Sequence, residues 1–397
     1  MRAAHRDDAV KIIHVVESLA VGGLERVVLS LASWQRRRGD ASRIVCLFHE
    51  GALAVEARAQ GIDVLAVNKT PGLDLRALRA LRAALRACDA DVLHTHNAVA
   101  HYYAAAAAVG LGIAYVINTR HGMGPVRASW QLDRLYRAAL LGTDAAVSVC
   151  QAGQDRFLQA GIIPADKAVV VANGVAVADI QTRNPQARAR LLAQLERPAS
   201  SIVLGSVGRL DPVKDHTTLL RALHLLRSRG RAVELVVAGD GESRASLEAL
   251  THTLQLKPCV HFLGMRQDVA QILSTFDIFV QSSISEGYSL ALVEAAAAAL
   301  PIVATRVGGN ADIVANGATG LLVPAQDAEA LAQALIRLVD DIGLRERMGS
   351  AGRQWALHHG TVEAMGQAYL ALYKGPPAGT GRNRAVPGRA TTPGPDA

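Results

Sequence analysis

Cysteines and aromatic residues are scarce in this sequence, and long apolar runs are missing. Only four cysteines occur among 397 residues, far apart and without a C-x-x-C pair, which argues against a disulfide framework or a zinc site and fits a reducing compartment. No run of about 18 apolar residues is present, so we expect no membrane-spanning helix. The N-terminal residues also lack the apolar segment of a secretory signal. These absences predict a cytoplasmic protein.

Apolar residues make up half of the sequence, although aromatic residues contribute only 4%. The core must therefore be built from Ala, Val, Leu and Ile, a composition that suits helices packed on parallel strands. The formal net charge of +7 permits contact with nucleic acid, anionic lipid or an anionic ligand, or reflects no more than a soluble surface. Charge alone therefore does not choose a partner.

Short apolar runs alternate with helical patterns twice along the chain. The runs expected to be strands are Lys11–Val16, Ser42–Phe48, Asp63–Val67, Asp91–Thr95, Tyr115–Thr119 and Asp144–Val149, then Ser201–Val207, Val233–Ala238, Val260–Leu263, Ile278–Gln281, Ile302–Ala304 and Gly320–Val323. The most clearly helical segments are Leu24–Arg38, Asp74–Ala87, Leu219–Ser228, Arg244–Leu254, Leu290–Ala299 and Ala328–Val339. This alternation predicts an α/β protein with two doubly wound, Rossmann-like domains, whose ligand lies in the cleft between the carboxyl ends of their strands.

The domain boundaries follow from changes in composition. We expect a first domain over residues 1–178 and a second domain over residues 179–352. The polar stretch Ala178–Ser200 reads as a linker with one amphipathic helix. The tail, residues 375–397, is rich in Gly, Pro and Arg and should be disordered because it cannot bury enough apolar surface to fold.

Two glutamates, Glu286 and Glu294, flank a predicted turn and helix start. Glu286 follows a strand, Gly287 permits a tight turn, and Glu294 lies in the early turns of the helix. Free N–H groups at a helix start bind anions or hydroxyls, and carboxylates beside them can accept hydrogen bonds from vicinal hydroxyls. The alternative is that Glu286 caps the helix and Glu294 is a surface charge.

The segment SEGYSLALVEAAAAALPIVATRVGG, residues 285–309, resembles the signature of a large family of retaining glycosyltransferases with the GT-B fold, the family-4 type or glycosyl transferases group 1. Further pieces match in order between about Lys11 and Tyr373: Gly22-Gly23-Leu24-Glu25, His94-Thr95-His96, Thr119-Arg120-His121-Gly122, Asn173-Gly174-Val175, Val207-Gly208-Arg209-Leu210 with Lys214, and Gly239-Asp240-Gly241-Glu242. Each piece is weak alone, but their joint order and spacing are specific. The resemblance, and not the composition, implies that a C-terminal helix at about 353–373 rejoins the first domain.

Two cations follow the first strand of the second half. Arg209 and Lys214 are able to neutralise a diphosphate without a metal, or they are two solvated loop charges. The resemblance implies that both grip the donor pyrophosphate. Gly22-Gly23 begins a helix after the first strand, either as a phosphate-binding turn or as an ordinary one.

Histidines and a D-x-D motif raise the question of a metal. His121 follows a strand; it could donate to a sugar hydroxyl or the reacting oxygen, or be structural, and the resemblance places it near the reaction centre. His94 and His96 share one face of a strand, but no third ligand has suitable spacing, so we expect no metal. Asp89 and Asp91 precede that strand at its N-terminal edge, away from the cleft, and are interpreted as helix-end and strand-start residues.

The resemblance implies a site for a nucleotide-sugar donor, with no cofactor and no metal. The residues expected to be catalytic are His121, Glu286, Arg209 and Lys214. The residues expected to bind the donor are Gly23, Arg209, Lys214, Gly239, Glu286, Gly287, Tyr288, Ser289, Leu290 and Glu294. Glu294 should take the ribose hydroxyls and Glu286 those of the donor sugar. G-x-G-x-x-G is absent, which weakens a dinucleotide oxidoreductase interpretation.

A closer resemblance to sugar transferases of exopolysaccharide clusters rests on HVVESLAVGGLERVVLSLA, residues 14–32, and on the segment around His121. It implies a glycan or polyprenyl-linked acceptor and no nucleic acid partner. The alternatives are a sugar-nucleotide 2-epimerase of the same architecture and a two-lobed solute-binding protein, although the latter needs an export signal. The donor base, the sugar and the linkage are not specified by these motifs.

One helix carries a basic face. Within Asp74–Ala87, arginines 76, 79, 82 and 86 recur every three or four residues, opposite leucines 75, 78, 81 and 85. This face is either a solvated helix surface or a peripheral contact with an anionic membrane, such as the inner face of the plasma membrane.

Overall fold

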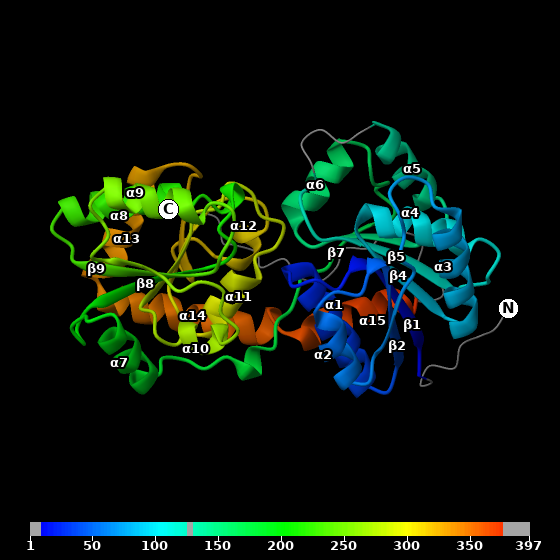
Figure 1. Ribbon diagram of the computed structural model, residues 1–397, viewed down its shortest axis with the longest axis horizontal. Helices are drawn as coiled ribbons and strands as arrows, with labels where there is room; N and C mark the ends of the chain where they lie inside the picture. The colour runs from blue at the N-terminus through cyan, green and yellow to red at the C-terminus, as the bar shows by residue number, and fades with distance from the viewer. Residues whose placement is uncertain (1–8, 125–129, 376–397) are drawn as a thin grey trace, which may run out of the picture.

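The computed structural model describes residues 9–124 and 130–375. It has two lobes, each a parallel sheet covered by helices (Figure 1). The α/β, GT-B-type architecture predicted from the sequence is confirmed. The expected disordered tail lies outside the described residues apart from Gly375.

The first lobe is built on seven parallel strands in the order β3-β2-β1-β4-β5-β6-β7. The strands are β1 (Lys11–Ser18), β2 (Ala41–His49), β3 (Asp63–Ala66), β4 (Val92–His96), β5 (Tyr115–Arg120), β6 (Ala145–Ser148) and β7 (Ala168–Val170). The helices are α1 (Gly23–Arg37), α2 (Leu53–Ala59), α3 (Leu75–Cys88), α4 (Asn97–Ala108), α5 (Trp130–Leu140) and α6 (Gln151–Gln159). The strand order reverses between β1 and β4, and a ligand site is expected beyond the carboxyl ends of those strands.

The second lobe repeats this plan with six parallel strands in the order β10-β9-β8-β11-β12-β13. The strands are β8 (Ile202–Val207), β9 (Val233–Ala238), β10 (Val260–Phe262), β11 (Ile278–Gln281), β12 (Ile302–Thr305) and β13 (Gly320–Val323). The helices are α7 (Pro185–Gln194), α8 (His216–Ser228), α9 (Arg244–Thr253), α10 (Val269–Leu273), α11 (Leu290–Ala297), α12 (Asn310–Ile313), α13 (Ala328–Asp340) and α14 (Ile342–His359). Its order reverses between β8 and β11.

Both sheets are buried on two faces, which explains their continuous apolar strands. Most residues of β9 and β11 are fully buried, as parallel strands between helical layers require. The core of each lobe is aliphatic, with few aromatic side chains, as the composition predicted.

The C-terminal segment differs from the single helix expected over about 353–373. It forms two helices, because α14 ends at His359 and α15 (Val362–Tyr373) begins after the cap residue Thr361. At this break the backbone of Val175 bonds to Gly360 and Val362. Ala356 of α14 packs in a core cluster of the second lobe, whereas Tyr369 and Tyr373 of α15 pack in the first, where α15 lies beside α1 (Figure 1).

Candidate functional site

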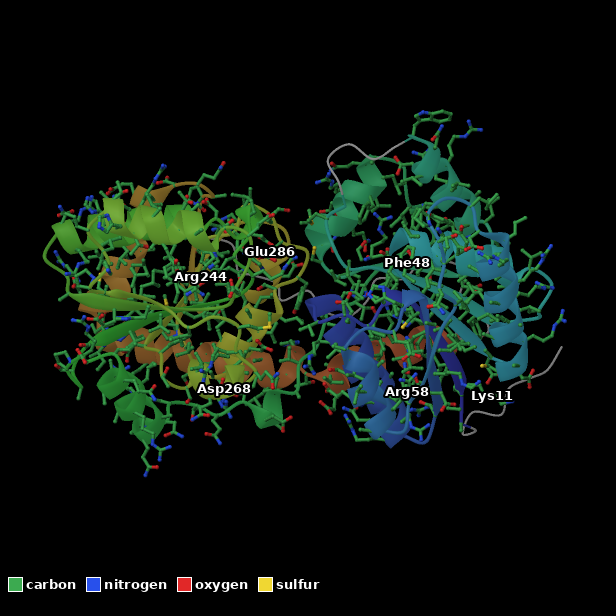
Figure 2. The ribbon with its side chains drawn as sticks, in the orientation of Figure 1. Lys11, Phe48, Arg58, Arg244, Asp268 and Glu286 are labelled. Carbon is green, nitrogen blue, oxygen red and sulfur yellow. The ribbon has the colours of Figure 1, made fainter. Side chains whose placement is uncertain are left out.

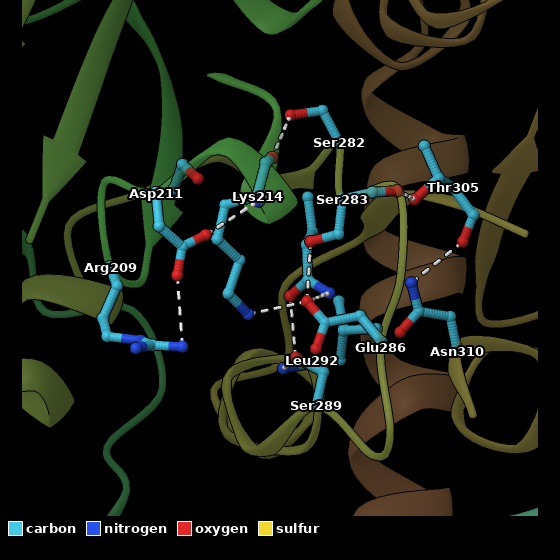
Figure 3. A network of polar contacts seen from close by, with 12 residues as sticks. Arg209, Asp211, Lys214, Ser282, Ser283, Glu286, Ser289, Leu292, Thr305 and Asn310 are labelled. Carbon is cyan, nitrogen blue, oxygen red and sulfur yellow. Dashed lines mark hydrogen bonds and ion pairs between the residues drawn. The ribbon is translucent and has the colours of Figure 1, made fainter. Parts of the chain in front are cut away.

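Glu286 lies on the side of the second lobe that faces the first (Figure 2). It follows β11, and its Oε1 accepts hydrogen bonds from Lys214 Nζ at 2.6 Å, Ser283 Oγ at 2.6 Å and Gln281 Nε2 at 3.0 Å (Figure 3). All three donors reach the same oxygen, so Oε2 is left for a ligand. The carboxylate is therefore held in one orientation before any ligand arrives.

The two cations expected to bind the diphosphate differ in their surroundings. Lys214 ends a short 3-10 turn, Pro212–Lys214, and its side chain is 21% exposed in the ion pair with Glu286. Arg209 is 81% exposed, and Asp211 is its ion-pair partner at 3.1 Å (Figure 3). Lys214 thus belongs to a fixed network, whereas Arg209 is free to reorient toward an anion.

Gly239 supports the loop that carries Arg209. Its φ is 153°, and its amide donates to the carbonyl of Gly264 at 2.8 Å. A Cβ at this position would lie 1.8 Å from the carbonyl oxygen of Gly208. A side chain here would displace the Arg209 loop, so the need for glycine is structural.

The two lobes meet at Gly287. A Cβ on this residue would lie 2.4 Å from the carbonyl oxygen of His121 in the first lobe. On its other side, the Gly287 carbonyl accepts from Gly309 N at 3.0 Å. Only glycine permits this approach, which brings the loop after β5 beside Glu286.

The start of α11 faces the start of α1 across the lobes. A Cβ on Gly23 would lie 3.7 Å from Leu290 Cδ1. Ser289 caps α11: its Oγ accepts from Leu292 N at 3.4 Å and donates to Gln281 Oε1 at 2.7 Å. Gly22 gives α1 no side-chain cap. The carboxylate of Glu25 lies over this helix start, accepts a hydrogen bond from its own backbone N–H and is near Arg209, so an anion would have to displace it.

Two residues expected to bind the donor have other roles for their side chains. Tyr288 is 7% exposed and lies in a core cluster, so only its backbone can face a ligand. Ser289 is 4% exposed and its hydroxyl is used in capping. Leu290 remains partly exposed next to Gly23.

Glu294 lies on α11 and is half-buried. Burial raises the pKa of this carboxyl to about 7, and the positive charge of Arg26 on α1 opposes the increase. Near neutral pH the group therefore exists in both protonation states, and a ligand that donates hydrogen bonds to it would favour the ionised state.

His121 follows β5, and the residue is held by two contacts. Its amide donates to Asn97 Oδ1 at 3.2 Å, and its Nε2 lies 2.9 Å from His96 Nδ1. Its Nδ1 is buried and has no hydrogen-bond partner among the described residues. Burial lowers the pKa of His121 to about 3, so the imidazole is neutral at physiological pH.

A third imidazole, which was not expected from the sequence, lies beside His94 and His96. His14 on β1 joins His94 and His96, and their ligand atoms lie within 4.8 Å of one another. Every ring nitrogen of these three residues already takes part in a hydrogen bond. The cluster is therefore a polar network that a metal would have to break.

The D-x-D residues lie at the opposite edge of the first sheet. Asp89 is in the left-handed conformation after α3 and pairs with Lys11 Nζ at 3.0 Å, and Asp91 Oδ2 accepts from Lys11 N at 2.9 Å. Both precede β4, whose carboxyl end is at His96.

The basic helix differs from the face expected for it. Arg82 donates to the carbonyls of Ala107 and Val109 at the end of α4, at 2.8 and 2.6 Å, and is not part of a solvated face. Leu75 is 54% exposed rather than buried opposite the arginines. The remaining arginines, 76, 79 and 86, are exposed.

Sequence reasoning missed the residues that orient the expected ones. Gln281 links Glu286 to Ser289, and Ser283 and Asp211 complete the network around Lys214. Their positions, at the end of β11 and in the loop after β8, were the feature of the sequence that could have identified them as site residues. His14 and Gln35 carry no local motif, and only the fold reveals their relation to His121.

Two family models cover most of the chain. Residues 21–179 match "Glycosyltransferase Family 4" and residues 187–355 match "Glycosyl transferases group 1". The chain belongs to these GT-B glycosyltransferases. The chain is 27% identical to UDP-Gal:alpha-D-GlcNAc-diphosphoundecaprenol alpha-1,3-galactosyltransferase of Escherichia coli (86% of this chain, 90% of that protein). It is 29% identical to a GDP-mannose-dependent alpha-mannosyltransferase of Mycobacterium tuberculosis (87% and 93%).

Other relatives extend the comparison. Lipopolysaccharide core biosynthesis glycosyltransferase LpsE of Rhizobium meliloti is 34% identical, but the match spans 47% of this chain and about half, 53%, of that protein. The solved structure of Anabaena Alr3699/HepE in complex with UDP has a TM-score of 0.82 at 23% identity, covering 91% of this chain and 99% of that chain. This likeness shows the shared GT-B fold.

Replacing Glu294 with Gln should stabilise the protein at high pH. The folded state holds the proton of Glu294 up to about pH 7, whereas the ordinary pKa is 4.5. Stability is therefore lost as pH rises from 4.5 through 7, because burial disfavours the charge. Thermal melts should show E294Q above wild type at pH 8 and close to it at pH 5. The exposed Glu346→Gln is the control; equal effects of E294Q at both pH values would contradict the raised pKa.

Arg209→Ala should weaken nucleoside diphosphate binding without changing the melting temperature. Arg209 is largely exposed and contributes little to the fold, and a charge-assisted contact contributes about 1.5–3 kcal/mol. Lys214→Ala should reduce both affinity and melting temperature, because it also removes the partner of Glu286. Calorimetry with UDP, GDP, uridine and guanosine measures the affinity that the diphosphate contributes. Arg266→Ala, paired with Asp268 elsewhere, is the control. An unchanged diphosphate affinity in R209A and K214A would contradict the assignment.

Proposed function

We propose that this enzyme transfers a hexose from a nucleoside diphosphate sugar, with retention of anomeric configuration and without a metal, to a glycan or polyprenyl-linked acceptor. The observation that carries the proposal is the convergence of Arg209, Lys214 and the starts of α1 and α11 around one region between the lobes. Two cations and the start of α11 favour a diphosphate; the start of α1 would contribute once the carboxylate of Glu25 has moved aside.

The carboxylates beside this region suit the sugar hydroxyls. Glu286 presents Oε2 from a fixed orientation, which supports a contact with the donor sugar. Glu294 lies further along α11 and is proposed to accept from the ribose. Arg209 and Lys214 stabilise the charge of the leaving diphosphate, so that positioning and electrostatics lower the barrier.

Retention without a covalent intermediate is part of the proposal. Oε1 of Glu286 already accepts three hydrogen bonds, one from an ammonium, which reduces its nucleophilicity. We therefore favour a same-face displacement in which the leaving phosphate assists the incoming acceptor hydroxyl. Lys214 and Arg209 supply the positive charge that a metal would otherwise provide.

A role in exopolysaccharide or other surface polysaccharide synthesis is supported by the acceptor in the name of the Escherichia coli relative, a diphosphoundecaprenol. Among the described residues, no helix has both the length and the apolar character that crossing a membrane requires. The first lobe carries an apolar groove of about 970 Å³ bordered by α3, α4 and α5. Leu73 and Leu141 on its rim are 82% and 84% exposed, which supports a peripheral contact with lipid beside the arginines of α3.

A transfer assay tests the function. The enzyme is incubated with a panel of UDP-, GDP- and ADP-sugars and a polyprenyl-diphosphate-linked sugar, with and without EDTA. We expect one donor to yield product of unchanged anomeric configuration, by NMR, at the same rate in EDTA. Loss of activity in EDTA and recovery with manganese would contradict metal independence. Conversion of the donor without an acceptor would support the 2-epimerase alternative, which the transferase relatives do not favour.

The two glutamates should give different kinetic defects. Positive charge develops on the sugar during transfer while the ribose is unchanged, so Glu286→Gln should mainly reduce kcat and leave free nucleoside diphosphate binding normal. Glu294→Gln should weaken binding of the free nucleotide. Calorimetry and steady-state kinetics on both variants decide; if E286Q loses the free nucleotide and E294Q does not, the roles are reversed.

A further inference from the structure

A buried chain of side chains leads from His121 into the first lobe. His121 Nε2 meets His96 Nδ1 at 2.9 Å, His96 Nε2 meets His14 Nδ1 at 3.1 Å, and His14 Nε2 meets Gln35 Oε1 at 2.8 Å. His14, Gln35 and His96 are at most 1% exposed. The chain therefore runs from the cleft to α1 through three imidazoles, without water between them.

Each imidazole in this chain is neutral. Burial lowers the pKa of His14 to about 4 and of His121 to about 3, and it holds the pKa of His96 well below its ordinary value. A neutral imidazole has one N–H and one lone pair. In a chain linked nitrogen to nitrogen, the direction of one hydrogen bond therefore fixes the direction of all.

Gln35 sets that direction. Its Oε1 can only accept, so His14 Nε2 carries the proton and His14 Nδ1 accepts from His96 Nε2. His96 Nδ1 then accepts from His121 Nε2. The remaining nitrogen of His121, Nδ1, then carries a lone pair and no proton, and it has no hydrogen-bond partner among the described residues.

The amide of Gln35 also organises a second arm. Its Nε2 donates to Tyr373 OH at 3.2 Å, and the same hydroxyl lies 2.8 Å from His94 Nδ1. His94 Nε2 lies 2.8 Å from Thr119 Oγ1. The hydroxyls of Tyr373 and Thr119 can each donate or accept, so this arm does not fix the His94 tautomer. Ser42 Oγ donates to Gln35 Oε1 at 3.0 Å. Turning the amide over would reverse every bond from His14 to His121 and place a proton on Nδ1 of His121.

We propose that Gln35 is a positioning residue that, through His14 and His96, fixes His121 in the tautomer whose Nδ1 accepts a hydrogen bond. Nδ1 is buried in the ligand-free structure, so a ligand reaches it only after a local movement. The ligand group that then fits this nitrogen is a hydroxyl of the sugar or acceptor, a point that rests on the proposed function. His121 thus accepts from a hydroxyl through Nδ1, in place of the donation expected from the sequence. The carbonyl end of one amide specifies the cleft chemistry across three rings.

Nitrogen NMR of the full chain labelled with ¹⁵N-histidine tests the tautomer directly. Wild type should show Nε2 of His121 protonated and Nδ1 not, with the same pattern in His14 and His96, assigned by single His→Gln variants. The protein is analysed for bound metal by mass spectrometry beforehand. A protonated Nδ1 on His121, or stoichiometric zinc on the three buried imidazoles, would overturn the proposal whether or not the enzyme transfers sugar.

Variants separate a positioning role from a structural one. Gln35→Leu should mix the His121 tautomers and lower kcat by about 10- to 100-fold, by analogy with the loss of a partner that orients a metal-binding histidine, with nucleoside diphosphate affinity unchanged. Tyr373→Phe breaks only the second arm and should preserve the tautomer.

In a His121→Phe background, Gln35→Leu should have no further effect on kcat. An unaltered His121 spectrum in folded Q35L would overturn the role of Gln35. If the wild-type protein shows the expected tautomers but H121F keeps wild-type kcat, the role of His121 in the reaction is rejected. The hydrogen-bond chain from Gln35 to His121 would still stand.

Discussion

The approach of two backbones, Gly287 in the second lobe and His121 in the first, is the constraint on which the site depends. A Cβ on Gly287 would lie 2.4 Å from the His121 carbonyl oxygen, so the lobes could not meet here with any other residue. The contact brings Glu286, the start of α11 and His121 into one region. Groups from residues far apart in the sequence thereby become one site between two separately folded sheets.

The site combines fixed and free charges. Glu286 and Lys214 are held by one another and by neutral donors, whereas Arg209 is largely exposed and pairs with Asp211. Glu294 and the imidazoles are buried enough that burial shifts their pKa values toward the neutral forms. A suitable ligand would bring negative charge to Arg209 and Lys214. It would also bring hydroxyl groups that donate hydrogen bonds to Glu286 and Glu294. A nucleoside diphosphate sugar has both features, which is why the electrostatics and the family agree.

The sequence predicted the parts of the fold that leave a clear apolar pattern. The bounds of β9, β11 and β13 match the predicted runs, because buried parallel strands are short and continuously apolar. The alanine-rich α4 was not predicted, since alanine on every face gives no amphipathic signal. The break at Gly360 had a local signal, a glycine followed by the capping Thr361, which the expected single helix passed over; bonds to Val175, far away in sequence, complete it. The role of Gln35 lay beyond sequence reasoning because it reaches His121 through residues on β1 and β4.

The position of a bound nucleoside diphosphate tests the central claim most directly. A crystal structure of the complex should place the diphosphate within hydrogen-bonding distance of Arg209 and Lys214, at the start of α11, with the ribose hydroxyls on Glu294. A nucleotide bound instead at the opposite edge of the first sheet, with a divalent cation on Asp89 and Asp91, would contradict the account.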